Sequence, residues 1–367
     1  MQYKKILFFL TFYPVIFFML VKYSLGIDIS SETFDSNLSV IDSEQNVKVI
    51  ASHKFANNQN GFAECHKWIT KNRKQKDIRL VVTMEATGVY YENCALFLFK
   101  KGYPVAVVLP NKAKKYMQST GLKSKNDKID AKGLARMGAE QSLKSWEPMT
   151  EFFYQLRELT RQHQSLQEHR TVLLNQIHAN ENGMFLNAMV MRQLKSLVTV
   201  IDKQIEATET AIEKHVASNS EAAAKVKKIT KIKGLGVLTI ATLIAETNGF
   251  ALFSTAPQLV SYAGYDVVEN QSGTHQGKTR ISKKGNSRIR RALHMPALGV
   301  VRWEQTPFLN LYVRTLEKHN LKMKSYVAVQ KKLLVVIYAL WKKNEEYNNN
   351  YLTDKYTVPQ EQIKKAA

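Results

Sequence analysis

The first part of the chain alternates apolar segments with short polar turns, and the spacing of the apolar positions predicts both strands and helices. In order along the chain, the pattern predicts strands over 24–30, 34–41 and 47–52, a helix over 59–72, a strand over 78–84, a helix over about 89–102 and a strand over 104–109. Strands that come first and then alternate with helices are typical of a mixed sheet covered by helices. We therefore expect an α/β domain over residues 23–145.

The rest of the chain reads as helical. After a helix over 127–142, two long stretches at 151–179 and 190–216 carry apolar residues at alternating three- and four-residue spacing, with a break at Asn180–Gly183. This pattern predicts a coiled-coil linker over 146–220, either a helical hairpin or a dimeric coiled coil. Short helices and glycine-containing turns, rich in Lys and Arg, predict a small and mostly helical domain over 226–343. A polar tail, 344–367, ends the chain.

The N-terminal segment, residues 1–22, is apolar and could be taken for a signal peptide or a membrane anchor. The run from Ile6 to Val21 contains Pro14 and is shorter than the ~20 residues that a spanning helix needs. A second methionine, Met19, comes just before the first predicted strand. We expect the first eighteen residues to be an upstream extension from a mis-assigned start, with a real anchor as the alternative.

Composition narrows the class of partner. The 367 residues carry a formal net charge of +22, with a pI of about 9.7, and this excess favours a polyanion, above all nucleic acid. The alternative is a basic surface that serves only solubility. The two cysteines, Cys65 and Cys94, form no C-x-x-C pair, so the sequence predicts neither a disulfide framework nor a zinc site, and favours a reducing cytoplasm.

Four carboxylates of the α/β domain stand at positions where ligands bind. Asp28 lies inside the first predicted strand, and a charge there needs a compensating cation. Glu85 ends a later strand, and Asp127 and Asp130 are three residues apart, so they share one face of a helix. Such oxygen ligands suit Mg²⁺ or Mn²⁺ in phosphoryl transfer. Taken singly, each has an ordinary interpretation: Asp127 as a helix N-cap, Asp28 as a hydrogen-bonded strand residue and Glu85 as a surface residue.

Basic residues surround these carboxylates in the sequence and predict contacts to a nucleic-acid backbone. They are Lys112, Lys114, Lys115, Lys123, Lys125, Lys128, Lys132 and Arg136. The alternative is a solvated basic loop and helix face.

The C-terminal region carries two further candidate contacts to nucleic acid. Gly234 and Gly236 precede a predicted helix, as in the turn of a helix-hairpin-helix, where backbone N–H groups can meet a phosphate. The run from 278 to 291 contains seven Lys or Arg and no acid, and predicts a phosphate-binding loop and helix. Its basic residues are Lys278, Arg280, Lys283, Lys284, Arg288, Arg290 and Arg291. Ser272, followed by Gly273, lies just before this run, although a Ser-Gly pair alone is usually a turn.

Three motifs together resemble a known family. Gly26-Ile-Asp-Ile-Ser30, Glu85-Ala-Thr-Gly-Val-Tyr90 and Asn126-Asp-Lys-Ile-Asp-Ala-Lys132 are similar to the DEDD domain of bacterial transposases of the insertion-sequence 110 family. That domain resembles Holliday-junction resolvases with a ribonuclease H-like fold, as in RuvC. The resemblance covers residues from about 23 to 340. It implies that Asp28, Glu85, Asp127 and Asp130 bind metal and that a C-terminal serine is the nucleophile. We assign that role to Ser272, with Ser282 and Ser261 as alternatives.

The resemblance also implies a function. It predicts a bacterial, cytoplasmic and nucleoid-associated recombinase that excises and inserts its own insertion sequence, guided by a structured noncoding RNA of the element, with no membrane association. Acids and serine would form one composite site in a homodimer or homotetramer, where serine attack leaves a phosphoserine link and a 3′-OH. The alternatives are a metal-only junction resolvase or nuclease, in which Ser272 is a turn residue, and a non-catalytic nucleic-acid-binding protein.

Overall fold

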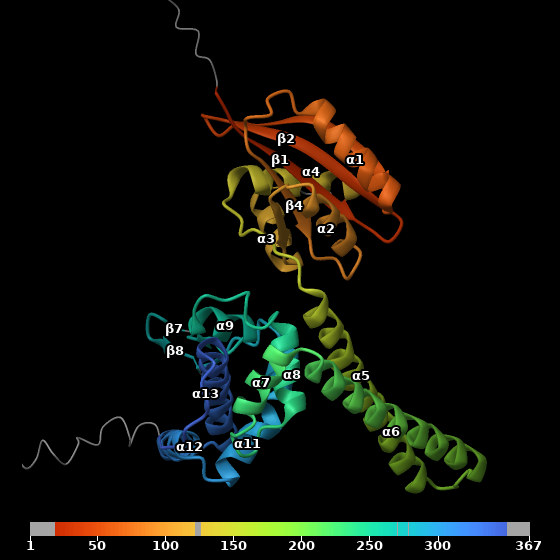
Figure 1. The fold of residues 1–367 in the computed structure, drawn as a ribbon, viewed down its shortest axis with the longest axis vertical. Coiled ribbons are helices and arrows are strands. Elements are labelled where there is room, and N and C mark those ends of the chain that lie inside the picture. The colour runs from red at the N-terminus through yellow and green to blue at the C-terminus, as the bar shows by residue number, and fades with distance from the viewer. Residues whose placement is uncertain (1–18, 122–125, 270, 278, 351–367) are drawn as a thin grey trace, which may run out of the picture. The chain divides into compact units, whose positions relative to one another are not determined.

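The computed structural model describes residues 19–121, 126–269, 271–277 and 279–350, and the chain divides into two compact units, Met1–Pro148 and Met149–Ala367 (Figure 1). Of the predicted apolar extension, residues 1–22, residues 1–18 lie outside the described residues, as does most of the polar tail, while residues 20–22 belong to the first strand. Within the described ranges, no helix is both long enough and apolar enough to cross a membrane.

The first unit is built on a five-stranded mixed sheet, as the sequence predicted. Its strands are β1 (Leu20–Ile29), β2 (Thr33–Asp42), β3 (Val47–Ala56), β4 (Leu80–Glu85) and β5 (Val105–Val108). They stand in the order β3-β2-β1-β4-β5, so the first strand is central. β1 runs antiparallel to β2 and parallel to β4, and this pairing brings the carboxyl ends of β1 and β4 together.

The two faces of β1 differ in side-chain size. Tyr23, Leu25 and Ile27 belong to a hydrophobic core that also contains side chains of α1 (Gln59–Asn72) and α2 (Glu92–Lys100). The alternate positions, Ser24 and Gly26, lie instead against α4 (Asp127–Glu140). Because side chains alternate along a strand, Asp28 belongs to the α4 face. One further helix, α3 (Pro110–Ser119), was not predicted, although a proline at its N-terminus favours a helix start there.

The second unit begins with a helical hairpin. Helices α5 (Glu151–Glu181) and α6 (Ala188–Ala217) contact each other, and the connection falls close to the predicted break at Asn180–Gly183. Polar pairs join the two helices: Arg170 Nε lies 2.6 Å from Asp202 Oδ1, and His163 Nε2 lies 2.9 Å from Glu209 Oε1.

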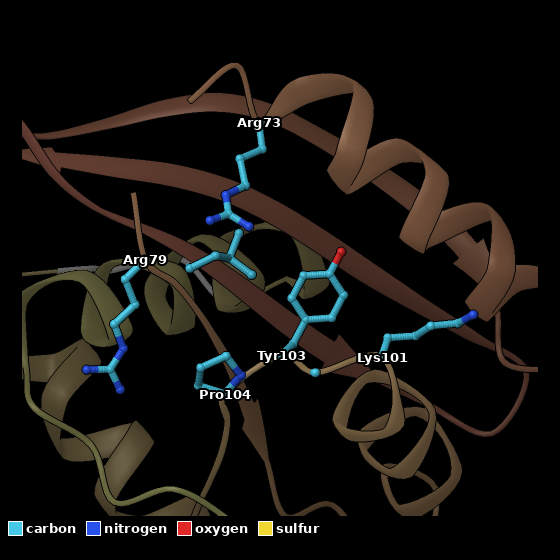
Figure 2. A pocket seen from close by; sticks show the side chains of 7 residues that line it. Arg73, Arg79, Lys101, Tyr103 and Pro104 are labelled. Carbon is cyan, nitrogen blue, oxygen red and sulfur yellow. The ribbon is translucent and has the colours of Figure 1, made fainter. Parts of the chain in front are cut away.

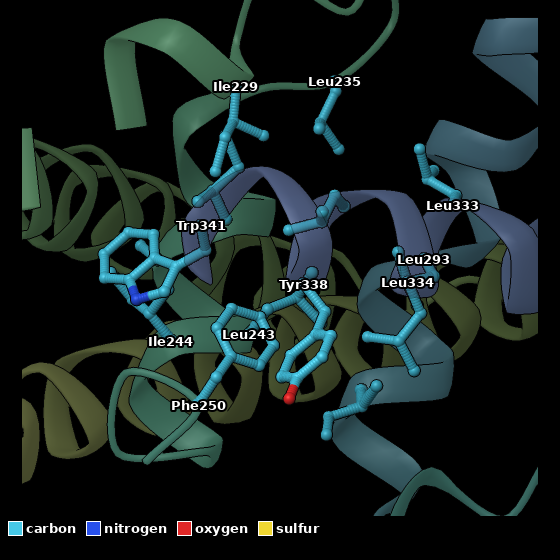
Figure 3. Close-up of a cluster of buried hydrophobic side chains, with 14 of the residues drawn as sticks. Ile229, Leu235, Leu243, Ile244, Phe250, Leu293, Leu333, Leu334, Tyr338 and Trp341 are labelled. Atoms are coloured by element: carbon cyan, nitrogen blue, oxygen red, sulfur yellow. The ribbon is translucent and has the colours of Figure 1, made fainter. Parts of the chain in front are cut away.

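The remainder of the second unit packs around one apolar core, shown in Figure 3. Its helices are α7 (Ser220–Ile229), α8 (Val237–Glu246), α9 (Ala256–Ala263), α10 (Ser287–Ala292), α11 (His294–Arg302), α12 (Thr306–His319) and α13 (Lys322–Lys343). Trp341 of α13 lies beside Ile244 of α8 and Phe250, and Leu334 of the same helix lies near Leu293. Four strands of two residues each, which the sequence pattern did not reveal, form two small ribbons: β6 (Val267–Val268) with β9 (Arg280–Ile281), and β7 (Gln271–Ser272) with β8 (His275–Gln276).

Candidate active site and nucleic-acid interface

Strand pairing brings Asp28 and Glu85 together. Ile27 of β1 stands in register with Met84 of β4, so the next residue of each strand, Asp28 and Glu85, lies at the same edge of the sheet. Asp28 is half-buried, and so is Glu85. The carboxyl ends of adjacent parallel strands are the usual location of a ligand site in such sheets.

Helix α4 supplies the other two carboxylates from its first turn. Its N-cap is Asn126, whose side chain accepts a hydrogen bond from the Ile129 amide at 2.9 Å. The capping interpretation of Asp127 is therefore wrong, and Asp127 and Asp130 both stand in the first helical turn. Asp127 is exposed, whereas Asp130 is half-buried.

Close packing of α4 on β1 determines where this first turn lies. A Cβ atom on Gly26 would stand 2.1 Å from the Ala131 carbonyl oxygen and 2.2 Å from the Ala135 amide nitrogen. Only glycine at this position lets the helix backbone rest on the strand. Gly138 repeats the arrangement further along α4, where a Cβ would lie 2.2 Å from Thr83 Oγ1. The small residues therefore fix α4 with its N-terminus toward Asp28.

The electrostatics show that the carboxylates influence one another. Burial, followed by the charges of neighbouring acids, raises the pKa of Asp28 to about 7. In decreasing order, those charges belong to Asp130, Asp127, Glu85 and Asp35. All four predicted acids thus belong to one electrostatic cluster, which we call the carboxylate site (Asp28, Glu85, Asp127 and Asp130).

Asp35 is a neighbour that the sequence interpretation missed. It stands opposite Asp28 in the β1–β2 register, it is buried, and Lys54 Nζ lies 3.6 Å from its carboxylate. The one feature of the sequence that could have placed Asp35 opposite Asp28 is the short turn at residues 30–32, because it fixes the register between β1 and β2.

The carboxylate site fits a divalent cation in its chemistry. Carboxylate oxygens are the donors that Mg²⁺ and Mn²⁺ prefer, and a bound cation would offset both the burial of the Asp28 charge and the repulsion from its neighbours, which together raise its pKa. Within the described part of the chain, however, no three His, Cys, Asp or Glu side chains converge closely enough to form a ready ligand set. The four carboxylates are therefore suitable ligands for a divalent cation in their chemistry and lie near one another. Their oxygens are not arranged as a complete set of metal ligands.

The predicted basic contacts of the first unit are exposed where they are described. Lys112, Lys114 and Lys115 lie on α3, and Lys128, Lys132 and Arg136 lie on α4. Lys123 and Lys125 lie outside the described residues. Arg136 has a protein partner, since its Nε lies 2.6 Å from Glu140 Oε1.

Ser272 lies in the ribbon of β7 and β8, which we call the serine hairpin (Gln271–Gln276). Ser272 is exposed and Gly273 turns the chain at a φ of 54°, with open space around it. Of the alternatives, Ser261 is exposed on α9, and Ser282 accepts a hydrogen bond from the Lys284 amide at 3.3 Å.

The basic run divides into two groups. Arg280, Lys283 and Lys284 are exposed, and Lys278 lies outside the described residues. By contrast, Arg290 donates to the Ala263 carbonyl at 2.7 Å, and Arg291 pairs with Glu168 of α5. These two arginines already have protein partners, which the run of charges in the sequence could not reveal. Arg288 is half-buried, with its Nε 4.0 Å from Glu246 Oε1.

Glu246 anchors this region and was also missed. It is 3% exposed, and Arg161 reaches it from α5 with two hydrogen bonds of 2.7 and 3.0 Å. Asn286, the N-cap of α10, donates a third at 2.7 Å. Burial alone would raise the pKa of Glu246. The hydrogen bonds and charge of Arg161, together with Asn286 and Arg288, outweigh this effect, so the pKa lies below its usual value.

The predicted helix-hairpin-helix turn joins α7 and α8. Gly234 has a φ of 94°, and a Cβ there would lie 2.8 Å from the Gly299 carbonyl carbon, so this glycine is required by packing against α11. Gly236 is the exposed N-cap of α8 with open space around it. Both glycines are exposed, and Gly236 lies at the N-terminus of a helix, where backbone N–H groups can meet a phosphate, so the two contacts stay a prediction.

Comparison with known proteins identifies the class. A family described as "Transposase" matches residues 25–186, and one described as "Transposase IS116/IS110/IS902 family" matches residues 226–313. Transposases are enzymes of DNA phosphoryl transfer. Because the two matches together cover more than half of the chain, the chain belongs to the insertion-sequence 110 family of transposases, which confirms the resemblance seen in the motifs.

Individual relatives agree with this assignment. A pilin gene-inverting protein of Moraxella bovis is 28% identical over 330 residues, which is 88% of this chain and 97% of that protein. The transposase for insertion sequence element IS1111A of Coxiella burnetii is 23% identical over 291 residues, 72% of this chain and 79% of that protein. A Thermus thermophilus RuvC structure covers 34% of this chain and 99% of its own, at 12% identity and a TM-score of 0.27, a likeness too weak to define the fold.

Proposed function

We propose that this chain is a DNA recombinase that excises and inserts its own insertion sequence, using the carboxylate site together with a serine nucleophile. The observation that carries the proposal is the electrostatic cluster around Asp28, in which burial, followed by the charges of neighbouring carboxylates from two further strands and a helix, raises the pKa of Asp28 to about 7. Perturbed carboxylates gathered at the edge of a sheet are typical of a phosphoryl-transfer site.

The first unit would act as a ribonuclease H-like metal-binding domain. Asp28, Glu85, Asp127 and Asp130 would hold Mg²⁺ or Mn²⁺, which when bound would polarise a phosphate and stabilise leaving oxygens. The chain itself would contribute the close packing of α4 on β1, which fixes the distance between the helix and the strand. This packing would keep the two carboxylates of the first turn of α4 near the ends of β1 and β4 before any substrate arrives.

The second unit would supply the nucleophile. The Oγ atom of Ser272 would form a bond to the scissile phosphorus while the bond from phosphorus to the 3′ oxygen breaks, which leaves a phosphoserine link and a 3′-OH. Exposed Arg280, Lys283 and Lys284 lie on the same segment and would neutralise the phosphate charge. The composite site of acids and serine would form in a homodimer or homotetramer in the bacterial cytoplasm.

An element-encoded guide RNA would select the DNA partners. The net charge of +22 and the exposed lysines of α3 and α4 support binding of a long polyanion, and RNA and DNA share that backbone charge.

A plasmid recombination assay in cells tests the proposal. It would supply the ends of the element and its noncoding flank, and would compare the wild type with Asp127→Ala, Ser272→Ala, Ser282→Ala and Ser261→Ala. Glu64→Ala, an exposed acid of α1, and Thr274→Ala, in the serine hairpin, are matched controls. We expect product from the wild type, the two controls and the two other serine variants, and none from Asp127→Ala or Ser272→Ala. Product from Ser272→Ala would contradict the serine assignment and favour a metal-only junction nuclease or another serine.

A further inference from the structure

A cavity of about 370 Å³ opens at the end of the sheet opposite the carboxylate site (Figure 2). Its walls, which we call the cationic pocket, are formed by Arg73, Arg79, Leu80, Lys101, Gly102, Tyr103 and Pro104. Three of the seven residues are cations and none is an acid. A concave surface with one sign of charge concentrates ions of the opposite sign.

The position of the pocket separates it from the candidate active site. Leu80 begins β4 and Glu85 ends it, so the two sites are roughly 16 Å apart along the strand at about 3.3 Å per residue. A phosphate in the pocket is therefore not the phosphate that the carboxylate site would act on.

The fold holds part of the pocket rigid. The Arg73 guanidinium donates to the carbonyl oxygens of Lys76, at 2.6 Å, and of Ile78, and this fixes the loop that leads into β4. On the other side, the Tyr103 hydroxyl lies 2.9 Å from His66 Nδ1. A preorganised wall lowers the entropy lost when a ligand binds.

The cations are crowded without a neutralising acid in the pocket wall. Burial and the nearby charge of Arg79 lower the pKa of Lys22, and burial and Lys101 lower the pKa of His66. Cations often lie at helix C-termini, where they stabilise the helix dipole, and Lys101 follows the end of α2 in this way. Arg79 lies in neither α1 nor α2, so stabilisation of a helix dipole does not account for its position.

We propose that the cationic pocket binds the phosphodiester backbone of a nucleic-acid strand other than the strand that is cut, with Arg79 as the principal contact. Arg79 is exposed at the mouth of the pocket, and a guanidinium can bind a phosphate through two parallel hydrogen bonds. Gly102 has a φ of 82°, and a Cβ added there would meet no atom within 4 Å, so the pocket wall at Gly102 leaves room for an approaching strand. The choice of nucleic acid as ligand rests on the function proposed above.

Binding by the purified full-length chain tests this site. Arg79→Glu is compared with Lys48→Glu, an equal charge reversal at an exposed residue of β3, which stands at the same end of the sheet but outside the pocket. The probes are a labelled single-stranded RNA, a DNA of the same sequence and inorganic phosphate, all in EDTA so that metal-dependent chemistry plays no part. We expect Arg79→Glu to raise Kd for a strand by roughly tenfold at 0.15 M salt and to lower the salt slope by about 1. Lys48→Glu should change Kd by less than about twofold.

Equal weakening by the two variants would overturn the proposal, because it would show a general charge effect. Phosphate that stabilises the wild type but not Arg79→Glu, with unchanged strand binding, would also overturn it in favour of a small-anion site. An effect on RNA alone or DNA alone supports the pocket and identifies its strand. Glu64→Ala, at an exposed acid of α1 outside both sites, should bind both strands as the wild type does. Because binding in EDTA is measured apart from recombination, a chain that fails to recombine but shows Arg79-dependent binding contradicts the proposed function and leaves the pocket standing.

Discussion

The carboxylate site and the serine hairpin differ in what holds their residues in place. The carboxylates are carried by two central strands and by a helix that lies directly on the backbone of one of them. Ser272 stands in a ribbon of two-residue strands, exposed and beside a glycine with open space around it. A substitution that strains the carboxylate site should therefore lower both the stability and the activity of the protein. A substitution in the serine hairpin should lower the activity alone.

The largest effect is expected from Gly26→Ala. The added Cβ cannot stand 2.1 Å from the Ala131 carbonyl oxygen, so α4 must move away from β1 and take Asp127 and Asp130 with it. We expect a loss of about 1 to 3 kcal/mol in the free energy of unfolding, as for other overpacked sites. Recombination should fall by at least about a hundredfold, because sub-ångström placement of catalytic groups is critical.

Ser24→Ala is the matched control for Gly26→Ala. It alters the same face of the same strand, and it removes a buried hydroxyl that has no hydrogen-bond partner. Stability should stay constant or increase, with recombination unchanged. If Gly26→Ala behaved like Ser24→Ala, the close packing of α4 would have no part in placing the carboxylates.

Glu246 is a buried acid that joins helices of the second unit, and Glu246→Gln should reveal how much its ion pair stabilises that unit. The amide retains the size of the side chain but loses the charged pair with Arg161 and weakens the bond from Asn286. We expect about 2 to 3 kcal/mol less stability in urea unfolding. Glu168→Gln, which removes an exposed carboxylate paired with Arg291, is the control and should leave the unfolding midpoint unchanged. Equal effects of the two would mean that the buried network is no stronger than a surface pair.

These anchors show where sequence reasoning stops. The pattern placed α1 over 59–72 as observed, because its apolar face repeats regularly, and parallel strand order sufficed to bring Asp28 near Glu85. The partners of Arg290 and Arg291 could not be predicted, because a run of arginines in a sequence does not show whether the side chains bind phosphate or bind protein oxygens. Asp35 was missed because it faces Asp28 only in the observed register of the β1–β2 hairpin. A shift of one residue would move its side chain to the other face of the sheet.

The raised pKa of Asp28 predicts a pH dependence confined to the first unit. The folded pKa of about 7 exceeds the usual value of 3.8, so the folded state binds the proton more tightly. Stability is then lost as the pH rises from about 4 through 7. In EDTA, Asp28→Asn should melt a few degrees above the wild type at pH 8, and this difference should shrink as the pH falls towards 5. Mg²⁺ at pH 8 should raise the wild-type midpoint and leave that of Asp28→Asn unchanged. A constant gap between the two proteins across this range would contradict the electrostatic cluster.

The smallest effect on stability is expected from Ser272→Ala. An exposed hydroxyl at a turn contributes within about 0.5 kcal/mol, so the unfolding midpoint should not move, while recombination should disappear. The wild type should form a covalent adduct with a DNA substrate that is nicked near the cut, and peptide sequencing should locate the phosphate on Ser272. An adduct on Ser282, which is tied to the Lys284 amide, would move the nucleophile out of the serine hairpin. With the adduct on Ser272 the comparison would hold: the proposed nucleophile would be carried on a small exposed segment, whereas the carboxylates are positioned by the packing of a helix on a sheet.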